Sequence, residues 1–235
     1  MGAYSAQPQL SLLGFCMNIP LSTPTCAPNG SSQSLRLCVE GLSVQRAGRR
    51  IIDNIGFKLA EGEALVVSGR NGAGKSTLLR ALAGLLPTLQ GAVNLNSGDL
   101  EVELPQNTHY LAHADGMKLA LSVEENLNFW ANYLAAESHP RSQSIAQALS
   151  IVGLTHALRA PFGALSAGQK RRAALARLLV AYRPLWLLDE PMTALDQASR
   201  VRFAQAMRAH CVEGGLIVVA THEPLGFETT RELAL

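Results

Sequence analysis

The sequence has few aromatic and few charged residues, and it lacks any long apolar run. Aromatic residues make up 5% and charged residues 16% of the 235 residues, whereas hydrophobic residues make up 48%. This composition excludes a disordered chain, a coiled coil and a collagen-like repeat. The longest apolar stretches, such as 178–188 and 216–220, are shorter than the roughly 18 residues of a membrane-spanning helix. We therefore expect one globular domain that does not cross a membrane.

Further classes of protein are disfavoured by the cysteines, the net charge and the first residues. Four cysteines without a CxxC pair disfavour disulfides and zinc, so a reducing cytoplasm fits best. A net charge of +2 with scattered Lys and Arg does not favour nucleic acid as a partner. Residues 1–34 contain no Asp, Glu, Lys or Arg, and a secretory signal would need a basic start. We interpret them as a flexible N-terminal extension, with Met17 as a rival start.

From residue 35 the pattern is typical of short strands. LRLCVEGLSVQ at 35–45 and IIDNIGFKL at 51–59 alternate apolar and polar residues around the turn AGRR, which predicts a β-hairpin. A second turn at 61–63 precedes the apolar run ALVVSG at 64–69. Its Val-rich composition predicts a buried strand.

This predicted strand leads directly into a phosphate-binding motif. GRNGAGKST at 69–77 contains GxxxxGK[ST] and is followed by a helical pattern, which is the context that a P-loop requires. Its glycines let backbone N–H groups point at phosphate oxygens, and the helix N-terminus adds positive potential. Lys75 would reach the β- and γ-phosphates, Ser76 would bind Mg²⁺, and Thr77 would lie near the α-phosphate. The predicted nucleotide-binding residues of the loop are Gly69, Arg70, Asn71, Gly72, Ala73, Gly74, Lys75, Ser76 and Thr77.

A second apolar run, PLWLLDEP at 184–191, ends in two acids. We expect this strand to lie beside the P-loop strand, with both acids serving one site because the chain turns at the strand end. Asp189 would hold Mg²⁺, directly or through water, and Glu190 would polarise the water that attacks the γ-phosphate. An acidic turn after a core strand is the competing interpretation.

LSAGQKRRAALARLL at 165–179 predicts an amphipathic helix. Ser166 and Gln169 form the pattern of a capping box, and Gly168 allows close approach of an anion. We expect the basic run 170–172 to form a solvated face opposite the leucines, and a role at a membrane surface is the alternative.

The order of these motifs resembles that of ATP-binding-cassette (ABC) ATPases. LSAGQ matches the family's signature sequence, ALD at 194–196 its D-loop, and Thr221-His222 its switch histidine. The resemblance covers residues 35–235, which it identifies as an ABC transporter nucleotide-binding domain. It implies an α/β P-loop NTPase fold with a RecA-like core, an N-terminal antiparallel β-subdomain and an inserted helical subdomain at about 115–182. ATP and Mg²⁺ are the implied cofactors.

The same resemblance implies residue roles and a dimer. Ser166, Gly168 and Gln169 of one copy would close on the γ-phosphate held by the P-loop of a second copy, in an ATP-sandwich dimer. Glu190 and His222 would be the catalytic residues.

Two positions differ from the general family pattern. Arg46 stands where an aromatic residue usually stacks on adenine, and its guanidinium plane could stack on the base instead. His113 replaces the glutamine that commonly ends the strand after the P-loop helix. A neutral imidazole could contact Mg²⁺ or water, and a hydrogen-bonded loop residue is the equal alternative.

The chain resembles the ATP-binding subunits of haem exporters in cytochrome c maturation. The resemblance rests on these two departures, on residues 110–134 and on ATHEPLG at 220–226. The resemblance implies a peripheral protein at the cytoplasmic face of the bacterial inner membrane, whose ATP hydrolysis drives haem export or release from a haem chaperone. Its partners would be an integral-membrane permease subunit, a further membrane subunit and a second copy of itself, with no nucleic acid. The apolar side chains that would form a groove for the membrane partner, or pack in the core, are Met117, Leu119, Phe129, Trp130 and Tyr133.

Other functions remain as alternatives. The chain could be the ATPase subunit of a different ABC exporter or importer. A soluble ABC ATPase acting on ribosomes or DNA would usually carry two cassettes, or a long coiled coil between P-loop and signature. A P-loop kinase would have no reason to contain LSAGQ.

Overall fold

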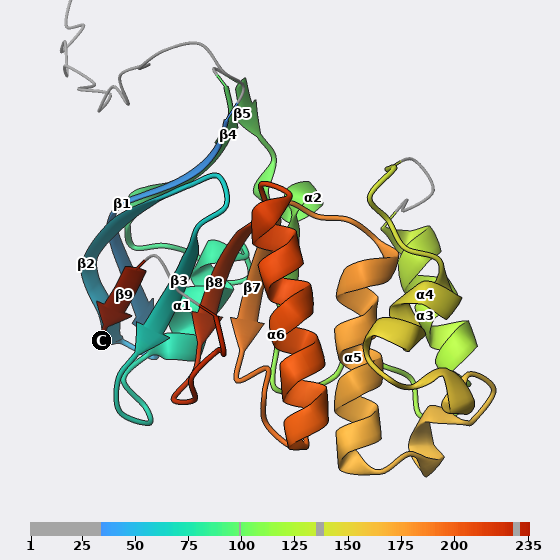
Figure 1. The fold of residues 1–235 in the computed structure, drawn as a ribbon. Coiled ribbons are helices and arrows are strands. Elements are labelled where there is room, and N and C mark those ends of the chain that lie inside the picture. Colours follow the sequence, from blue (N-terminus) through green and yellow to red (C-terminus); the bar gives the residue numbers. More distant parts are fainter. Residues whose placement is uncertain (1–33, 99, 135–138, 228–230) are drawn as a thin grey trace, which may run out of the picture. The chain divides into compact units, whose positions relative to one another are not determined.

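The computed structural model describes residues 34–98, 100–134, 139–227 and 231–235. Nearly all of the proposed N-terminal extension, residues 1–33, therefore lies outside the described residues. Within these ranges the strands form two sheets, with order β2-β1-β4-β5 in the first and β6-β7-β8-β3-β9 in the second (Figure 1). No helix in the described ranges is both long and apolar enough to cross a membrane.

The first sheet is antiparallel and contains the hairpin expected from residues 35–59. Its strands are β1 (Leu35–Arg46), β2 (Arg49–Ala60), β4 (Gln90–Ser97) and β5 (Leu100–Val102). The turn residues Ala47 and Gly48 have φ values of +48° and +77°, typical of the type I′ turn that matches the twist of a two-residue hairpin. The hairpin prediction is confirmed, and Arg46 pairs with Arg49 at its tip.

The second sheet is parallel, and its strand order corrects one prediction. Its strands are β3 (Ala64–Ser68), β6 (Thr108–Leu111), β7 (Leu185–Asp189), β8 (Leu216–Ala220) and β9 (Arg231–Ala234). The acid-ending strand β7 does not lie beside the P-loop strand β3, because β8 pairs with both of them. Parallel neighbours need a crossover, and α6 (Gln197–Val212) returns the chain from β7 into this central position. The three strands are short apolar runs of equal length, so composition alone could not order them.

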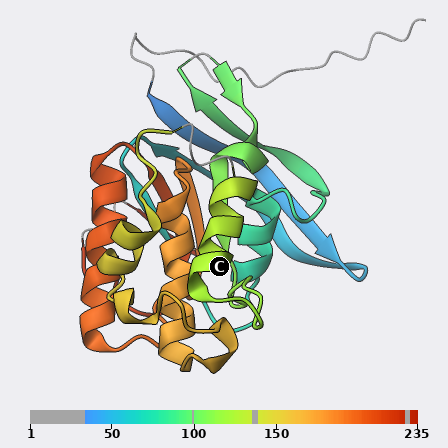
Figure 2. The same ribbon diagram turned by 90° about the vertical axis from the view of Figure 1, so that its right-hand side faces the viewer.

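The central strands bury both faces. Leu185, Leu187, Leu216 and Val218 pack with α1 (Lys75–Leu82) and the antiparallel sheet. The alternate residues Trp186, Leu188, Ile217 and Val219 pack with the helices on the other face, as the two-residue period of a strand requires. Figure 2 shows α5 and α6, in orange and red, on the side away from the antiparallel sheet.

Helices occupy most of the chain between β6 and β7. The short α2 (Leu104–Asn107) comes before β6. After β6 come α3 (Val123–Tyr133), α4 (Ile145–Ile151), the 3-10 turns η2 (Thr155–Ala157) and η3 (Phe162–Ala164), and α5 (Ala167–Val180). Each of α3, α4 and α5 begins at a serine capping box, at Ser122, Ser144 and Ser166, and the one predicted at Ser166 is confirmed. The reciprocal bonds satisfy helix N–H groups that have no partner inside the helix.

Two buried histidines make the stability of this fold depend on pH. Burial lowers the pKa of His109 to about 3 and that of His210 to about 4. Below about pH 6.5 an unfolded histidine takes up a proton that these folded ones do not, so stability is lost as the pH falls. Each should reduce the free energy of unfolding by about 2 kcal/mol between pH 6.5 and 5.

Denaturant unfolding of His109→Gln at both pH values tests this expectation. The glutamine amide can still donate to the Ala181 carbonyl, 2.6 Å from His109 Nε2, but it does not titrate. The variant should therefore lose the part of the pH dependence that His109 contributes, about 2 kcal/mol between pH 6.5 and 5. An unchanged pH slope in His109→Gln would contradict the assignment.

Candidate functional site

The loop between β3 and α1 has the backbone expected of a phosphate-binding loop. Gly69, Gly72 and Gly74 have φ values of +138°, +83° and +112°. Residues other than glycine rarely adopt such positive φ values. At Gly74, a Cβ atom would also lie 2.8 Å from Ile52 Cδ1 of the hairpin. Since α1 begins at Lys75, its free N–H groups and positive end adjoin the curled loop.

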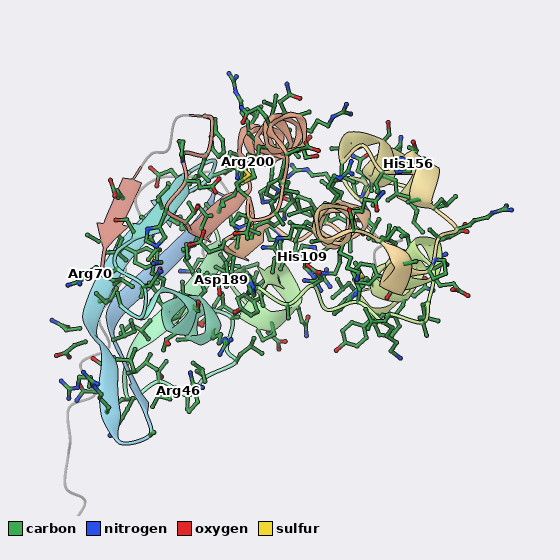
Figure 3. All side chains as sticks on the ribbon, turned by 90° about the horizontal axis from the view of Figure 1, so that it is seen from below. Arg46, Arg70, His109, His156, Asp189 and Arg200 are labelled. Atoms are coloured by element: carbon green, nitrogen blue, oxygen red, sulfur yellow. The ribbon has the colours of Figure 1, made fainter. Side chains whose placement is uncertain are left out.

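A cavity of about 350 Å³ lies over this loop. Three parts of the chain contribute to it: the hairpin, the P-loop with the start of α1, and the end of β7. Its lining residues are Arg46, Ile51, Asn71, Gly72, Gly74, Lys75, Ser76, Thr77, Asp189 and Glu190. Figure 3 shows Arg46 near the hairpin tip and Asp189 near the middle of the molecule, with Arg70 on the P-loop. Of the predicted loop residues, Gly69, Arg70 and Ala73 do not line the cavity.

The chain turns sharply at the two acids. Asp189 is the last residue of β7 and is 6% exposed. Glu190 has a φ of +46°, and its N–H donates to the Ala220 carbonyl at 2.9 Å. This turn brings both carboxylates to one cavity, although adjacent residues within a strand point to opposite faces. No hydrogen bond from the described residues reaches the Asp189 carboxylate, which leaves it available to a ligand.

His222 lies between the P-loop and Glu190. Its Nε2 atom is 2.8 Å from Lys75 Nζ, 3.2 Å from Asn71 Oδ1 and 4.0 Å from Glu190 Oε1. The strand order explains this position: β8, which ends just before His222, lies between β7 and β3. The carboxyl ends of the three strands therefore present an acid, an imidazole and a phosphate-binding loop side by side.

The Lys75 ammonium is nearly buried and turned back on its own loop. Besides the contact with His222, Nζ donates to the carbonyl oxygens of Gly69 at 2.7 Å and Arg70 at 3.3 Å. A single cation thus holds the loop in its curled form from the inside.

Arg171 corrects the expectation of a solvated basic face at 170–172. Its side chain is buried and donates to the carbonyls of Asp189 and Glu190, and it forms an ion pair with Asp115. Burial lowers the pKa of Arg171, and the Asp115 carboxylate opposes this effect. The overlooked signal is helical spacing, because Arg171, Leu175 and Leu178 follow the i, i+4, i+7 pattern of one face.

The remaining predicted residues lie outside the cavity. His113 is exposed in the segment after β6. Ser166 and Gln169 bond each other at the start of α5, and a Cβ atom on Gly168 would lie 2.9 Å from the Ala194 carbonyl oxygen. The motif at 165–169 therefore adjoins the ALD segment of the same chain. Ile51, by contrast, lines the cavity but was not predicted. Its place near the hairpin tip, two residues beyond Arg49, the partner of Arg46, is the signal that could have identified it.

The chain is similar to known proteins over most of its length. Residues 52–193 match the model of the family described as "ABC transporter". The "Cytochrome c biogenesis ATP-binding export protein CcmA" of Chelativorans sp. (strain BNC1) is 52% identical over 202 residues, covering 86% of this chain and 98% of that protein. The protein of the same name from Rhizobium meliloti (strain 1021) is 50% identical over 202 residues, with the same coverage.

A solved structure shows the same fold. A putative ABC transporter ATP-binding protein from Pyrococcus furiosus superposes with a TM-score of 0.73 at 24% identity, covering 85% of this chain and 97% of that one. The expected fold, a P-loop NTPase with an antiparallel β-subdomain and an inserted helical subdomain, is confirmed. The chain belongs to the ABC transporter family and is an ATP-binding subunit with ABC-type ATPase activity.

Proposed function

We propose that this chain is the ATP-hydrolysing subunit of a haem exporter that serves cytochrome c biogenesis. The observation that carries the proposal is its 52% identity to a cytochrome c biogenesis ATP-binding export protein over 98% of that relative. The subunit would act peripherally at the cytoplasmic face of the bacterial inner membrane. There it would power haem export, or release of haem from its chaperone.

The cavity supports roles for the chain's residues in ATP hydrolysis. Backbone N–H groups of the P-loop and the Lys75 ammonium would bind the β- and γ-phosphates. Glu190 would orient the attacking water and accept its proton. His222 would donate a hydrogen bond to the γ-phosphate, and its contacts with Lys75 and Glu190 support a position between the phosphate and the base.

The cavity also fits a magnesium ion. The Ser76 hydroxyl and the Asp189 carboxylate both line it, and hard oxygen donors are the ligands that Mg²⁺ prefers. The ion, when bound, would neutralise charge on the β- and γ-phosphate oxygens. His113 lies outside the cavity lining, so its predicted contact with the ion would require movement of the segment after β6.

Base recognition would fall to Arg46 and Ile51. Arg46 offers a planar cation that can stack on an aromatic base. Ile51 offers an apolar contact from the paired strand. Together they would replace the single aromatic ring that usually fills this role.

Two kinds of protein partner complete the proposal. A second copy of the chain would place its Ser166, Gly168 and Gln169 against the γ-phosphate, in a symmetric dimer with two sites. A CcmB-like permease, with a CcmC-like subunit as a further partner, would bind the helical region. Phe129 and Tyr133 of α3 stack at 5.8 Å and are 46% and 71% exposed, as an apolar docking surface would be.

Capture of tagged protein from detergent-solubilised native membranes tests the function. We expect cytochrome c maturation membrane subunits to co-purify with the wild type. The Phe129→Ser, Tyr133→Ser double variant should recover at least about tenfold less of them, because aromatic anchors dominate such interfaces. Val212→Ser, which alters an exposed apolar residue of α6, is the control. Recovery of a different permease would contradict haem export, and recovery of ribosomal proteins would contradict the transporter class.

A further inference from the structure

The Arg171 guanidinium has a hydrogen-bond acceptor for every one of its N–H groups. Nε donates to the Pro191 carbonyl at 3.3 Å, and Nη2 donates to the carbonyls of Asp189 at 3.0 Å and Glu190 at 2.9 Å. Nη1 donates to the Ala112 carbonyl at 3.0 Å and to the Asp115 carboxylate at 3.5 Å. Five donors in a fixed fork thus meet five acceptors from two separate segments.

Three of these acceptors are consecutive carbonyls around the acid pair. They belong to the turn in which Glu190 adopts a left-handed backbone. Such a conformation in a residue other than glycine persists only where its surroundings hold it. On one side, the Glu190 N–H bonds the Ala220 carbonyl. On the other, its carbonyl is held by Arg171, which reaches the turn from the first turns of α5.

The other two acceptors belong to the segment after β6. This segment leads into α3, whose exposed Phe129 and Tyr133 form the proposed docking surface. A displacement of residues 112–115 would therefore move a guanidinium that also holds the carbonyls of residues 189–191.

We propose that Arg171 is a positioning residue, which sets the orientation of the Glu190 carboxylate and links it to the segment after β6. This inference rests on the proposed role of Glu190. Among the described residues, the hydrogen bonds of the Arg171 guanidinium go to backbone carbonyls and to the Asp115 carboxylate, so we assign it no part in the chemistry itself.

The test is the rate of ATP hydrolysis and the affinity for ATP of purified full-length Arg171→Met. We expect kcat to fall about 100-fold, the loss typical of a reacting group misplaced by about 1 Å. The dissociation constant for ATP should change less than about threefold, because the P-loop is not altered. Arg171→Lys keeps the charge, but its three donors extend from one nitrogen. Its kcat should therefore lie between that of the wild type and that of Arg171→Met.

Arg177→Met is the matched control. Arg177 is equally buried on α5, and it donates to the carbonyls of Tyr110 and Asp115 and lies 4.4 Å from the Trp130 ring centroid. None of these contacts involves residues 189–191. Its loss should lower the melting temperature as much as Arg171→Met does. Because Arg177 shares only the Asp115 contact with the segment after β6, kcat should fall no more than the roughly fivefold expected for Asp115→Asn.

Asp115→Asn tests the link to the second segment. It weakens one of the five contacts, so a smaller fall in kcat of about fivefold is expected, with no further effect when Arg171 is already methionine.

The outcomes separate the two proposals. Wild-type kcat in Arg171→Met, or equal losses in Arg171→Met and Arg177→Met, would overturn the positioning role. Should Arg171→Met fail to fold, the same comparison applies to Arg171→Lys and Arg177→Lys. Wild-type turnover in Glu190→Gln would contradict the proposed catalytic base itself. A loss in Glu190→Gln without one in Arg171→Met would contradict the positioning role alone.

Discussion

Glu190→Gln is expected to lower the kcat of ATP hydrolysis by about 1,000-fold, within the range that a general base contributes. Glutamine has the same shape but cannot accept the proton of the attacking water. The P-loop and Lys75 are unchanged, so ATP should bind with nearly wild-type affinity. Because ATP is held but not cleaved, the variant should accumulate as a closed dimer.

Two measurements check this expectation together. Phosphate release gives kcat, and size-exclusion chromatography with ATP reports the dimer. Glu213→Gln, which neutralises an acid at the end of α6, should behave as the wild type in both. Undiminished phosphate release from Glu190→Gln would remove Glu190 from the base role, whatever the dimer shows.

Lys75→Ala is expected to abolish measurable ATP turnover, because it weakens ATP binding and removes a cation from the γ-phosphate. The ammonium is the cation of the P-loop that would meet the β- and γ-phosphates, and it also bonds the Gly69 and Arg70 carbonyls. Removing one partner of a desolvated charge pair costs about 3 kcal/mol, which is roughly 100-fold in affinity. The loop should also lose part of its curled form.

Equilibrium binding of a fluorescent ATP analogue measures the effect. Lys58→Ala removes an exposed lysine of β2, whose contact with Glu40 is 3.9 Å long, and it should bind the analogue as the wild type does. Wild-type affinity in Lys75→Ala would show that the N–H groups of the loop suffice for phosphate binding.

Local patterns predicted much of the fold and the site. The hairpin, the P-loop between a strand and a helix, and the capping box at Ser166 each depend on neighbouring residues along the chain. Their physical causes are turn conformation, glycine backbone freedom and short-range hydrogen bonds. These features could be located because their determinants lie within a few residues of one another.

Features that depend on distant parts of the chain were missed. The position of β8 between β7 and β3 is decided by how α6 packs over the sheet, and all three strands look alike in composition. Arg171 looks like one of three basic surface residues until the ends of β6 and β7 bring carbonyls to it. Ile51 joins the cavity only because the hairpin folds over the P-loop.

The left-handed backbone at Glu190 also constrains how this sequence can evolve. For a residue with a Cβ atom, this backbone conformation lowers the free energy of unfolding by roughly 1–2 kcal/mol. Glycine would avoid that loss. Selection for stability alone would therefore favour replacing the residue that the proposed reaction most needs. Thermostability and turnover oppose each other at this position, so stabilising changes should be sought elsewhere in the chain.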